Sequence, residues 1–164
     1  MTIRRAKYTQ QDCELVFSLS IDPLVRASSF NQSSIEYDSH CKWYERTVKD
    51  KNTLFFLVFA DEREKDFVGQ IRFKRESERS DECVISLSIT EDFRGRLLAT
   101  QFLALGIQEL QKNWTDIGFV SAEVKGENTA SNALFVRGGF ELLSNVNYYK
   151  LTLNVCVGGG THIG

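Results

Sequence analysis

Apolar residues recur at helical spacing twice in the first third of this chain. The first run follows Thr9, which with Asp12 has the form of a capping box. This spacing predicts a helix that ends near Ser20, and a second helix over residues 35–50.

Two short runs rich in aromatic and β-branched residues follow, at residues 54–60 and 67–74. The polar sequence "DEREKD" separates them, so the two runs predict a β-hairpin. A third run at residues 83–89, after another polar turn, predicts the next strand.

The middle of the chain has the pattern of a strand, a helix and a strand. From Ala99 to Trp114 the apolar residues fall at steps of three and four, and residues 117–124 have strand character. Together with residues 83–89 they predict a βαβ unit, whose two strands pair in parallel.

The last third predicts a short helix and two strands. Asn128 can cap the helix and Gly138 can end it. The sequences "FELL" and "YYKLTLNV" then predict the last pair of strands. The tail at residues 156–164 contains three successive glycines and is expected to be flexible.

The chain has 164 residues, of which 42% are hydrophobic, and this indicates a single domain over residues 1–155. A formal charge of −2 gives no basic field for nucleic acid, and no apolar run approaches the roughly 20 residues that span a membrane. The amino terminus has no secretory pattern, so we expect a cytoplasmic protein. Its expected partner is a small-molecule substrate, and a homodimer is an open alternative.

The cysteines give no sign of a metal site. They are widely spaced, form no C-x-x-C pair and do not cluster with the two histidines, His40 and His162. We expect reduced, inert thiols. The cysteines are Cys13, Cys41, Cys83 and Cys156.

The sequence "FRGRLLAT" lies between a predicted strand and a predicted helix. The first turn of a helix has free backbone N–H groups and the positive end of the helix dipole, so it favours an anion such as a phosphate. Arg94 and Arg96 add charge, and Gly95 allows close approach. The alternative is a plain turn with solvated arginines.

This loop, followed by a strand and by "NTASNALFVRGGF", resembles the GNAT family of acetyl-coenzyme A dependent N-acetyltransferases. The resemblance implies an α+β fold, with a largely antiparallel sheet, one splayed parallel pair and about four helices. It also implies acetyl-coenzyme A as cofactor and no metal. Leu97 stands where the family usually has glycine, and Phe135 where many members have tyrosine.

The resemblance implies that the cofactor lies along the splayed strand, the loop and the later helix, with its adenosine end near Arg96 or Lys125. The implied cofactor residues are Leu87, Ile89, Phe93, Arg94, Gly95, Arg96, Leu97, Leu98, Ala99, Thr100, Asn128, Ser131 and Phe135. Asn128 has the alternative role of a helix cap.

Residues 22–50, followed by "FVGQIRFK", are similar to the GNAT branch that acetylates nucleotide-linked amino sugars, as in pseudaminic acid synthesis. The candidate acceptor-binding residues are Asn31, His40, Trp43, Tyr44, Gln70 and Arg72. The alternatives are a core position for Trp43 and Tyr44, a satisfied surface position for His40 and a solvated sheet face for Gln70 and Arg72.

Glu123 is the candidate general base, acting directly or through a water held by Ser88. The alternatives are a surface carboxylate and a serine with local hydrogen bonds. Because residue 135 is phenylalanine, the leaving thiolate either stays unprotonated or takes a proton from water or another tyrosine. The tyrosines considered are Tyr37, Tyr44 and Tyr148.

These observations favour an N-acetyltransferase that moves acetyl directly to a primary amine, with a nucleotide-linked amino sugar as the expected acceptor. A protein amino terminus or a small polyamine is the alternative acceptor. A non-catalytic acyl-coenzyme A binding domain is the alternative from a different class.

Overall fold

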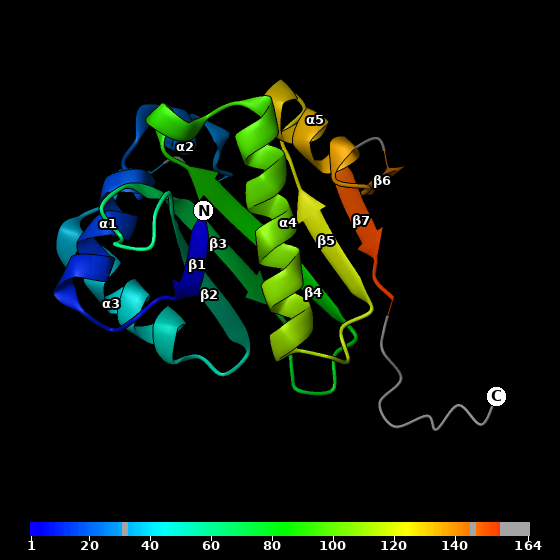
Figure 1. The fold of residues 1–164 in the computed structure, drawn as a ribbon, viewed down its shortest axis with the longest axis horizontal. Helices are drawn as coiled ribbons and strands as arrows, with labels where there is room; N and C mark the ends of the chain where they lie inside the picture. The colour runs from blue at the N-terminus through cyan, green and yellow to red at the C-terminus, as the bar shows by residue number, and fades with distance from the viewer. Residues whose placement is uncertain (31–32, 145–146, 155–164) are drawn as a thin grey trace.

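A seven-stranded sheet forms the centre of this computed structural model, which describes residues 1–30, 33–144 and 147–154 (Figure 1). The strand order is β1-β2-β3-β4-β5-β7-β6, and every neighbouring pair is antiparallel except β4 and β5. This confirms the expected α+β class. The strands are β1 (Thr2–Arg5), β2 (Thr53–Phe59), β3 (Phe67–Lys74), β4 (Glu82–Ile89), β5 (Phe119–Glu123), β6 (Glu141–Ser144) and β7 (Tyr148–Thr152).

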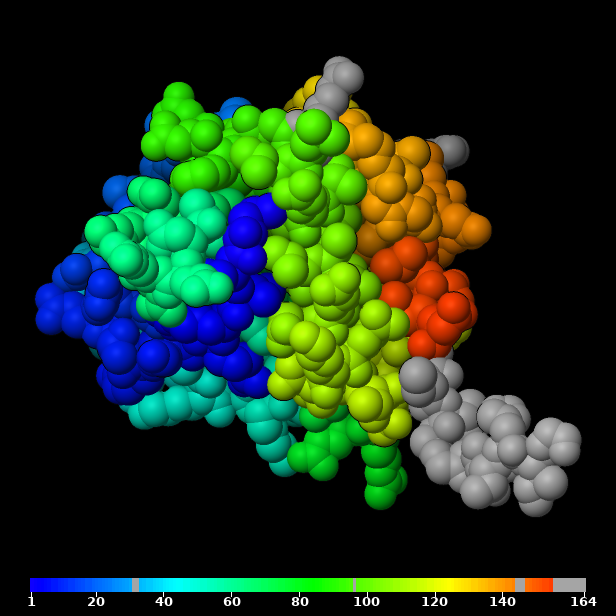
Figure 2. Space-filling model, in the orientation of Figure 1, coloured from blue at the N-terminus to red at the C-terminus, as the bar shows by residue number. Residues whose placement is uncertain are grey.

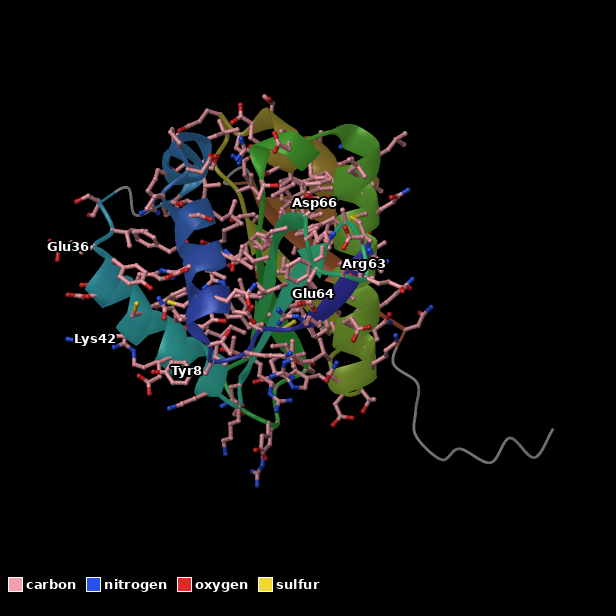
Figure 3. The ribbon with its side chains drawn as sticks, turned by 60° about the vertical axis from the view of Figure 1, so that its left-hand side comes forward. Tyr8, Glu36, Lys42, Arg63, Glu64 and Asp66 are labelled. Atoms are coloured by element: carbon pink, nitrogen blue, oxygen red, sulfur yellow. The ribbon has the colours of Figure 1, made fainter. Side chains whose placement is uncertain are left out.

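Helices cover both faces of the sheet. Helices α1 and α3 lie on one side and α4 lies on the other (Figure 3), and α4 runs down the visible face in the space-filling view (Figure 2). The helices are α1 (Gln10–Ser20), α2 (Pro23–Ser28), α3 (Tyr37–Lys49), α4 (Arg96–Asn113) and α5 (Thr129–Arg137), with a 3₁₀ turn η1 (Glu91–Phe93).

The sequence did not predict β1 and α2. Strand β1 has only four residues, two of them arginines, and α2 has six, so neither is long enough to show a period. The signal for α2 was Asp22 before Pro23, since an aspartate cap and proline in the first turn typically start a helix.

Strand β2 is buried along its whole length because it packs against helices on both faces. Leu54, Phe56 and Val58 join the larger core, which includes residues of α4 and α5. The alternate residues Phe55 and Leu57 join the smaller core formed with α1 and α3. The pleat of β2 therefore separates two cores.

The capping box at the start of α1 is formed only in part. Thr9 Oγ1 accepts a hydrogen bond from Asp12 N at 3.2 Å, as expected. The Asp12 carboxylate does not complete the box; it accepts two hydrogen bonds from the Arg4 guanidinium, each at 2.8 Å, and one from Lys7 N at 2.9 Å. The buried Asp12 therefore joins α1 to β1.

The parallel pairing between β4 and β5 is short. It comprises Glu82 with Phe119, Cys83 with Val120 and Val84 with Ser121. Beyond this point β4 continues beside β3 as far as residue 89, and β5 continues beside β7 as far as residue 123. The two strands therefore diverge, as the family resemblance implied.

Candidate functional site

A cavity of about 1000 Å³ lies where β4 and β5 diverge. Its walls are residues 85–89 of β4 and residues 123–125 at the end of β5. Residues 94–95 before α4, and residues 128–131 and 133–135 at the start of α5, line one part. Residues 24–25 and 27–30 of α2 and its following loop line another. The cavity thus joins two surfaces through the gap in the sheet.

Ser88 and Glu123 share the face of the sheet that carries α1 and α3. Ile85 of β4 and Ala122 of β5 belong to the core on the α4 side, and successive residues of a strand point to opposite faces. Both Ser88 and Glu123 line the cavity. The gap therefore presents a hydroxyl and a carboxylate on this face, next to strand edges that have no partner strand.

The amino end of α4 opens into the cavity at Gly95, the N-cap residue, which makes no side-chain capping bond. A Cβ placed on Gly95 would meet no atom within 4 Å, so the space around it is open. Leu97 is 81% exposed and lies outside the cavity wall, so its side chain does not narrow the approach. This end of α4 suits an anion.

Arg94 connects the end of β4 with the cap of α2 at the cavity. Its Nε donates to Ile89 O at 3.1 Å, and its Nη2 donates to Asp22 Oδ1 at 2.9 Å. The same Asp22 oxygen caps α2 by accepting from Leu24 N and Val25 N. Burial alone would raise the pKa of Asp22, but the hydrogen bonds from Val25 and Arg94 outweigh it and hold the pKa below its usual value. Sequence reasoning had assigned no role to Asp22.

Lys125 holds α2 from the opposite wall. Its Nζ donates to Ala27 O at 3.1 Å and lies 6.0 Å from the centre of the Phe30 ring. The six-residue α2 is therefore attached to both sides of the gap.

Helix α5 contributes Asn128, Ser131 and Phe135 to the cavity. Asn128 Oδ1 accepts from Ser131 N at 3.1 Å, so Asn128 is the cap of α5 as well as a wall residue. Phe135 is buried and stacks on Tyr149, with ring centres 5.9 Å apart. Its place in the wall leaves no hydroxyl at this position.

Arg72 reaches the cavity from β3. Its guanidinium lies 4.8 Å from the Trp43 ring centre and 5.6 Å from that of Phe55. Its Nε is buried and has no hydrogen-bond partner among the described residues. Burial lowers the pKa of Arg72 to about 10. Arg72 also lines a second groove, of about 630 Å³, beside α3.

Three other expected acceptor residues lie away from the cavity. His40 is buried, and its Nε2–H donates to Cys13 O at 3.0 Å. Tyr44 is fully buried and donates to Lys7 O at 2.6 Å. Gln70 is buried in β3, with its Oε1 unpartnered among the described residues. Tyr44 therefore has the core position that was its alternative, whereas His40 and Gln70 are buried and not at the surface as their alternatives had it.

The remaining acceptor candidates are placed differently. Trp43 lines the second groove and not the cavity, and Asn31 lies outside the described residues. The proton-donor candidates Tyr37 and Tyr148 are also absent from the cavity wall. Tyr148 donates instead to Glu82 Oε1 at 3.2 Å, near the closed end of the gap.

The expected cofactor residues divide into two groups. The structure brings together at the cavity Leu87, Ile89, Arg94, Gly95, Ala99, Asn128, Ser131 and Phe135. Four others are not in its wall: Phe93, Leu97, Leu98 and Thr100. The side chain of Arg96 is not among those that the structure describes. An α-helix turns its side chains outward at successive angles, so only part of a continuous stretch can face one cavity.

The thiols expected to be inert are free in the described residues, and Cys13 and Cys83 are buried. Cys13 and Cys41 lie 3.6 Å apart, sulfur to sulfur, between α1 and α3, while Cys156 lies outside the described residues. No metal-ligand cluster and no helix suited to crossing a membrane occur in the part of the chain that is described.

Comparison with protein-family models matches residues 1–141 to an acetyltransferase (GNAT) domain. A search of curated proteins finds no match.

Solved structures share the fold. Spermidine N-acetyltransferase from Vibrio cholerae, in complex with CoA and spermine, is 13% identical with a TM-score of 0.78, covering 92% of this chain and 94% of that one. Campylobacter jejuni N-acetyltransferase PseH, in complex with acetyl coenzyme A, is 17% identical with a TM-score of 0.69, covering 93% and 100%. Ribosomal-protein-alanine N-acetyltransferase from Brucella melitensis is 20% identical with a TM-score of 0.74, covering 93% and 100%.

The buried position of His40 predicts how stability depends on pH. Burial lowers the pKa of His40 below the ordinary histidine value of about 6.5, and the hydrogen bond to the Cys13 carbonyl opposes this in part. Below about pH 6.5, His40 therefore binds a proton in the unfolded chain but not in the folded chain. As the pH is lowered from 6.5 toward the pKa of the folded state, the free energy of unfolding should decrease by up to about 1.4 kcal/mol per pH unit.

Urea unfolding at about pH 5 and pH 7.5 measures this effect. His40→Gln should reduce the loss of stability between the two pH values, whatever its effect at pH 7.5. Equal losses in both proteins would contradict the placement of a neutral His40 in the core.

Proposed function

The chain belongs to the acetyltransferase (GNAT) family, and we propose that it transfers acetyl from acetyl-coenzyme A directly to the amine of a nucleotide-linked amino sugar. The single observation that favours this acceptor is Arg72, a guanidinium whose Nε is buried and unpartnered and which lies in the cavity wall.

The cavity offers the groups that acetyl-coenzyme A requires. The uncapped amino end of α4 and Arg94 suit its pyrophosphate, and the unpartnered edge of β4 at residues 85–89 suits its amide groups. Leu134 and Phe135 provide apolar surface beside them. The open space at Gly95 leaves room for a phosphate to approach the backbone.

Acetyl-coenzyme A supplies an activated acetyl group, which passes from sulfur to nitrogen as the N–C bond forms and the C–S bond breaks. Glu123 accepts the proton that the amine loses, directly or through a water held by Ser88. Backbone N–H groups on the free edge of β4 donate to the carbonyl oxygen as negative charge develops on it. The sulfur leaves as a thiolate, because no tyrosine among the described residues lines the cavity.

The charge of the cavity distinguishes between acceptors. A polyamine is a multiple cation, and an unpaired guanidinium repels it. An acceptor with phosphate groups provides the anion that a buried guanidinium lacks. The resemblance of residues 22–50 to the branch that acts on nucleotide-linked amino sugars supports the same choice.

The first prediction from the proposed function concerns the donor site. Arg94→Ala removes a charge-assisted hydrogen bond of about 1.5–3 kcal/mol, so the Kd for coenzyme A should rise roughly tenfold or more in calorimetry. The matched control is Asp22→Asn, which keeps an α2 cap but frees Arg94. If both variants weaken binding equally, Arg94 acts by holding α2 and not by contacting the cofactor.

The second prediction concerns the acceptor. Thiol release from acetyl-coenzyme A should be fastest with a nucleotide-linked amino sugar, with kcat/KM roughly ten- to a hundredfold above those for spermidine and for a peptide with a free amino terminus. Higher efficiency with spermidine or the peptide would reject the proposed acceptor. No thiol release with any amine would favour the non-catalytic alternative.

The third prediction concerns the proton. Glu123→Gln should lower kcat by roughly a hundredfold or more, since general bases typically contribute 10²–10⁴. In the native enzyme kcat/KM should rise with pH through one ionisation to a plateau, with no descending limb below the tyrosine range. Phe135→Tyr should leave the ascending limb in place. A bell-shaped native profile, or full activity in Glu123→Gln, would contradict these roles.

A further inference from the structure

A second groove leaves the cavity at Arg72 and Ser86, the two residues that line both hollows. It has a volume of about 630 Å³ and lies between the last part of α3 and the exposed side of β3 and β4. Val84 and Ser86 of β4 are exposed there. Helix α3 thus forms one wall of the groove, and the uncovered surface of β4 lies opposite.

Positive charge dominates this groove. Three cations present their charge to it, Arg46 from α3 and Arg72 and Lys74 from β3. None of the three forms an ion pair with a carboxylate of the described residues. Arg75 also borders the groove, but its guanidinium lies 4.1 Å from the ring centre of Trp114, and its Nε donates to Asn52 Oδ1 at 3.2 Å.

The two acids in the groove, Asp50 and Glu76, do not balance this charge. Asp50 accepts hydrogen bonds from Asn52 N at 2.9 Å and Thr53 Oγ1 at 2.8 Å, and these bonds and the charge of Lys74 hold the pKa of its carboxyl below its usual value. Asp50 therefore offsets one positive charge and leaves the others. Glu76 lies on the exposed turn after β3. An anion that enters the groove therefore meets an excess of positive charge.

Arg72 is the fixed point of the groove. Phe55, Arg72 and Ser86 stand opposite one another on adjacent strands, so Arg72 lies in the middle of a row across the sheet. The Trp43 and Phe55 rings hold the guanidinium at 4.8 and 5.6 Å, but they do not supply a hydrogen-bond acceptor for its buried Nε. A phosphate oxygen is an acceptor that matches a guanidinium.

We propose that this groove, defined by Arg46, Arg72 and Lys74, is a binding subsite for a phosphate or diphosphate group of the acceptor. The subsite rests on the proposed function, and it adds the place where the acceptor's anionic part is held. Arg72 pairs with Ser86 from β3, and the parallel register that pairs Val84 with Ser121 puts Glu123 level with Ser86 across the gap. Arg72 and Glu123 therefore lie on opposite sides of Ser86, where the groove and the cavity meet. An acceptor bound at this point offers its amine to Glu123 and its phosphate to Arg72.

Inorganic pyrophosphate tests the subsite directly. The protein is first saturated with coenzyme A, so that the amino end of α4 is occupied, and is then titrated with pyrophosphate in a calorimeter. Arg46→Gln and Arg72→Met should each raise the pyrophosphate Kd roughly tenfold or more. Arg46 is exposed, so its replacement leaves the core intact if Arg72→Met fails to fold. The matched control is Lys112→Gln, which removes the charge of an exposed lysine on α4, away from the groove.

Absence of pyrophosphate binding to the coenzyme A complex, or a Kd that changes no more in Arg46→Gln than in Lys112→Gln, overturns the subsite. If either of these outcomes is found but the protein acetylates nucleotide-linked amino sugars, the proposed function stands and only the subsite is rejected. Variant-sensitive pyrophosphate binding without such turnover keeps the anion site and rejects the proposed acceptor.

Kinetics provide a second measurement. With Arg46→Gln, KM should rise roughly tenfold for the nucleotide-linked amino sugar and stay unchanged for the same amino sugar without phosphate. An equal rise for both acceptors would show that Arg46 does not act through the phosphate, and it would count against the subsite.

Discussion

The site depends on the point at which β4 and β5 stop pairing. Each strand has another partner, β3 for β4 and β7 for β5, and each keeps that partner after the parallel pairing ends at Val84 and Ser121. The sheet therefore divides without losing its outer ladders. What remains in the gap is backbone with unused hydrogen-bonding capacity, which normally costs free energy when buried and is available to a ligand here.

Close packing on both sides fixes this geometry. Gly69 lies beside the end of β4, where an added Cβ would come within 2.2 Å of Ser88 O. Across the gap, Asn132 donates to Lys125 O and Asn128 O and accepts from Tyr149, which joins the turn before α5 to β7. Each half of the sheet therefore has packing contacts of its own, and α2 is attached to both halves.

The sequence predicted the elements with a clear period and missed those without one. The hairpin, the βαβ unit and the capped α5 follow from local patterns, whereas β1 and α2 are too short to show any. The site was harder to predict because a side chain's direction depends on packing. His40 and Tyr44 shared a helix with Trp43, but their hydrogen bonds to backbone oxygens of Cys13 and Lys7 place them in the core. The Asp22–Arg94 pair joins residues 72 positions apart, and no local pattern reports it.

Arg94 and Arg72 illustrate two ways of keeping a cation at the proposed binding site. Arg94 has a carboxylate partner, Asp22, which also caps α2, so an anion that takes the same N–H competes with the contact that holds this short helix. Arg72 has aromatic rings in place of a carboxylate, and these hold its position without neutralising it. Binding at Arg94 therefore exchanges one ionic contact for another, while binding at Arg72 satisfies a group that has none. For equal geometry, a hydrogen bond from Arg72 to a ligand anion should therefore contribute more binding free energy than the same bond from Arg94.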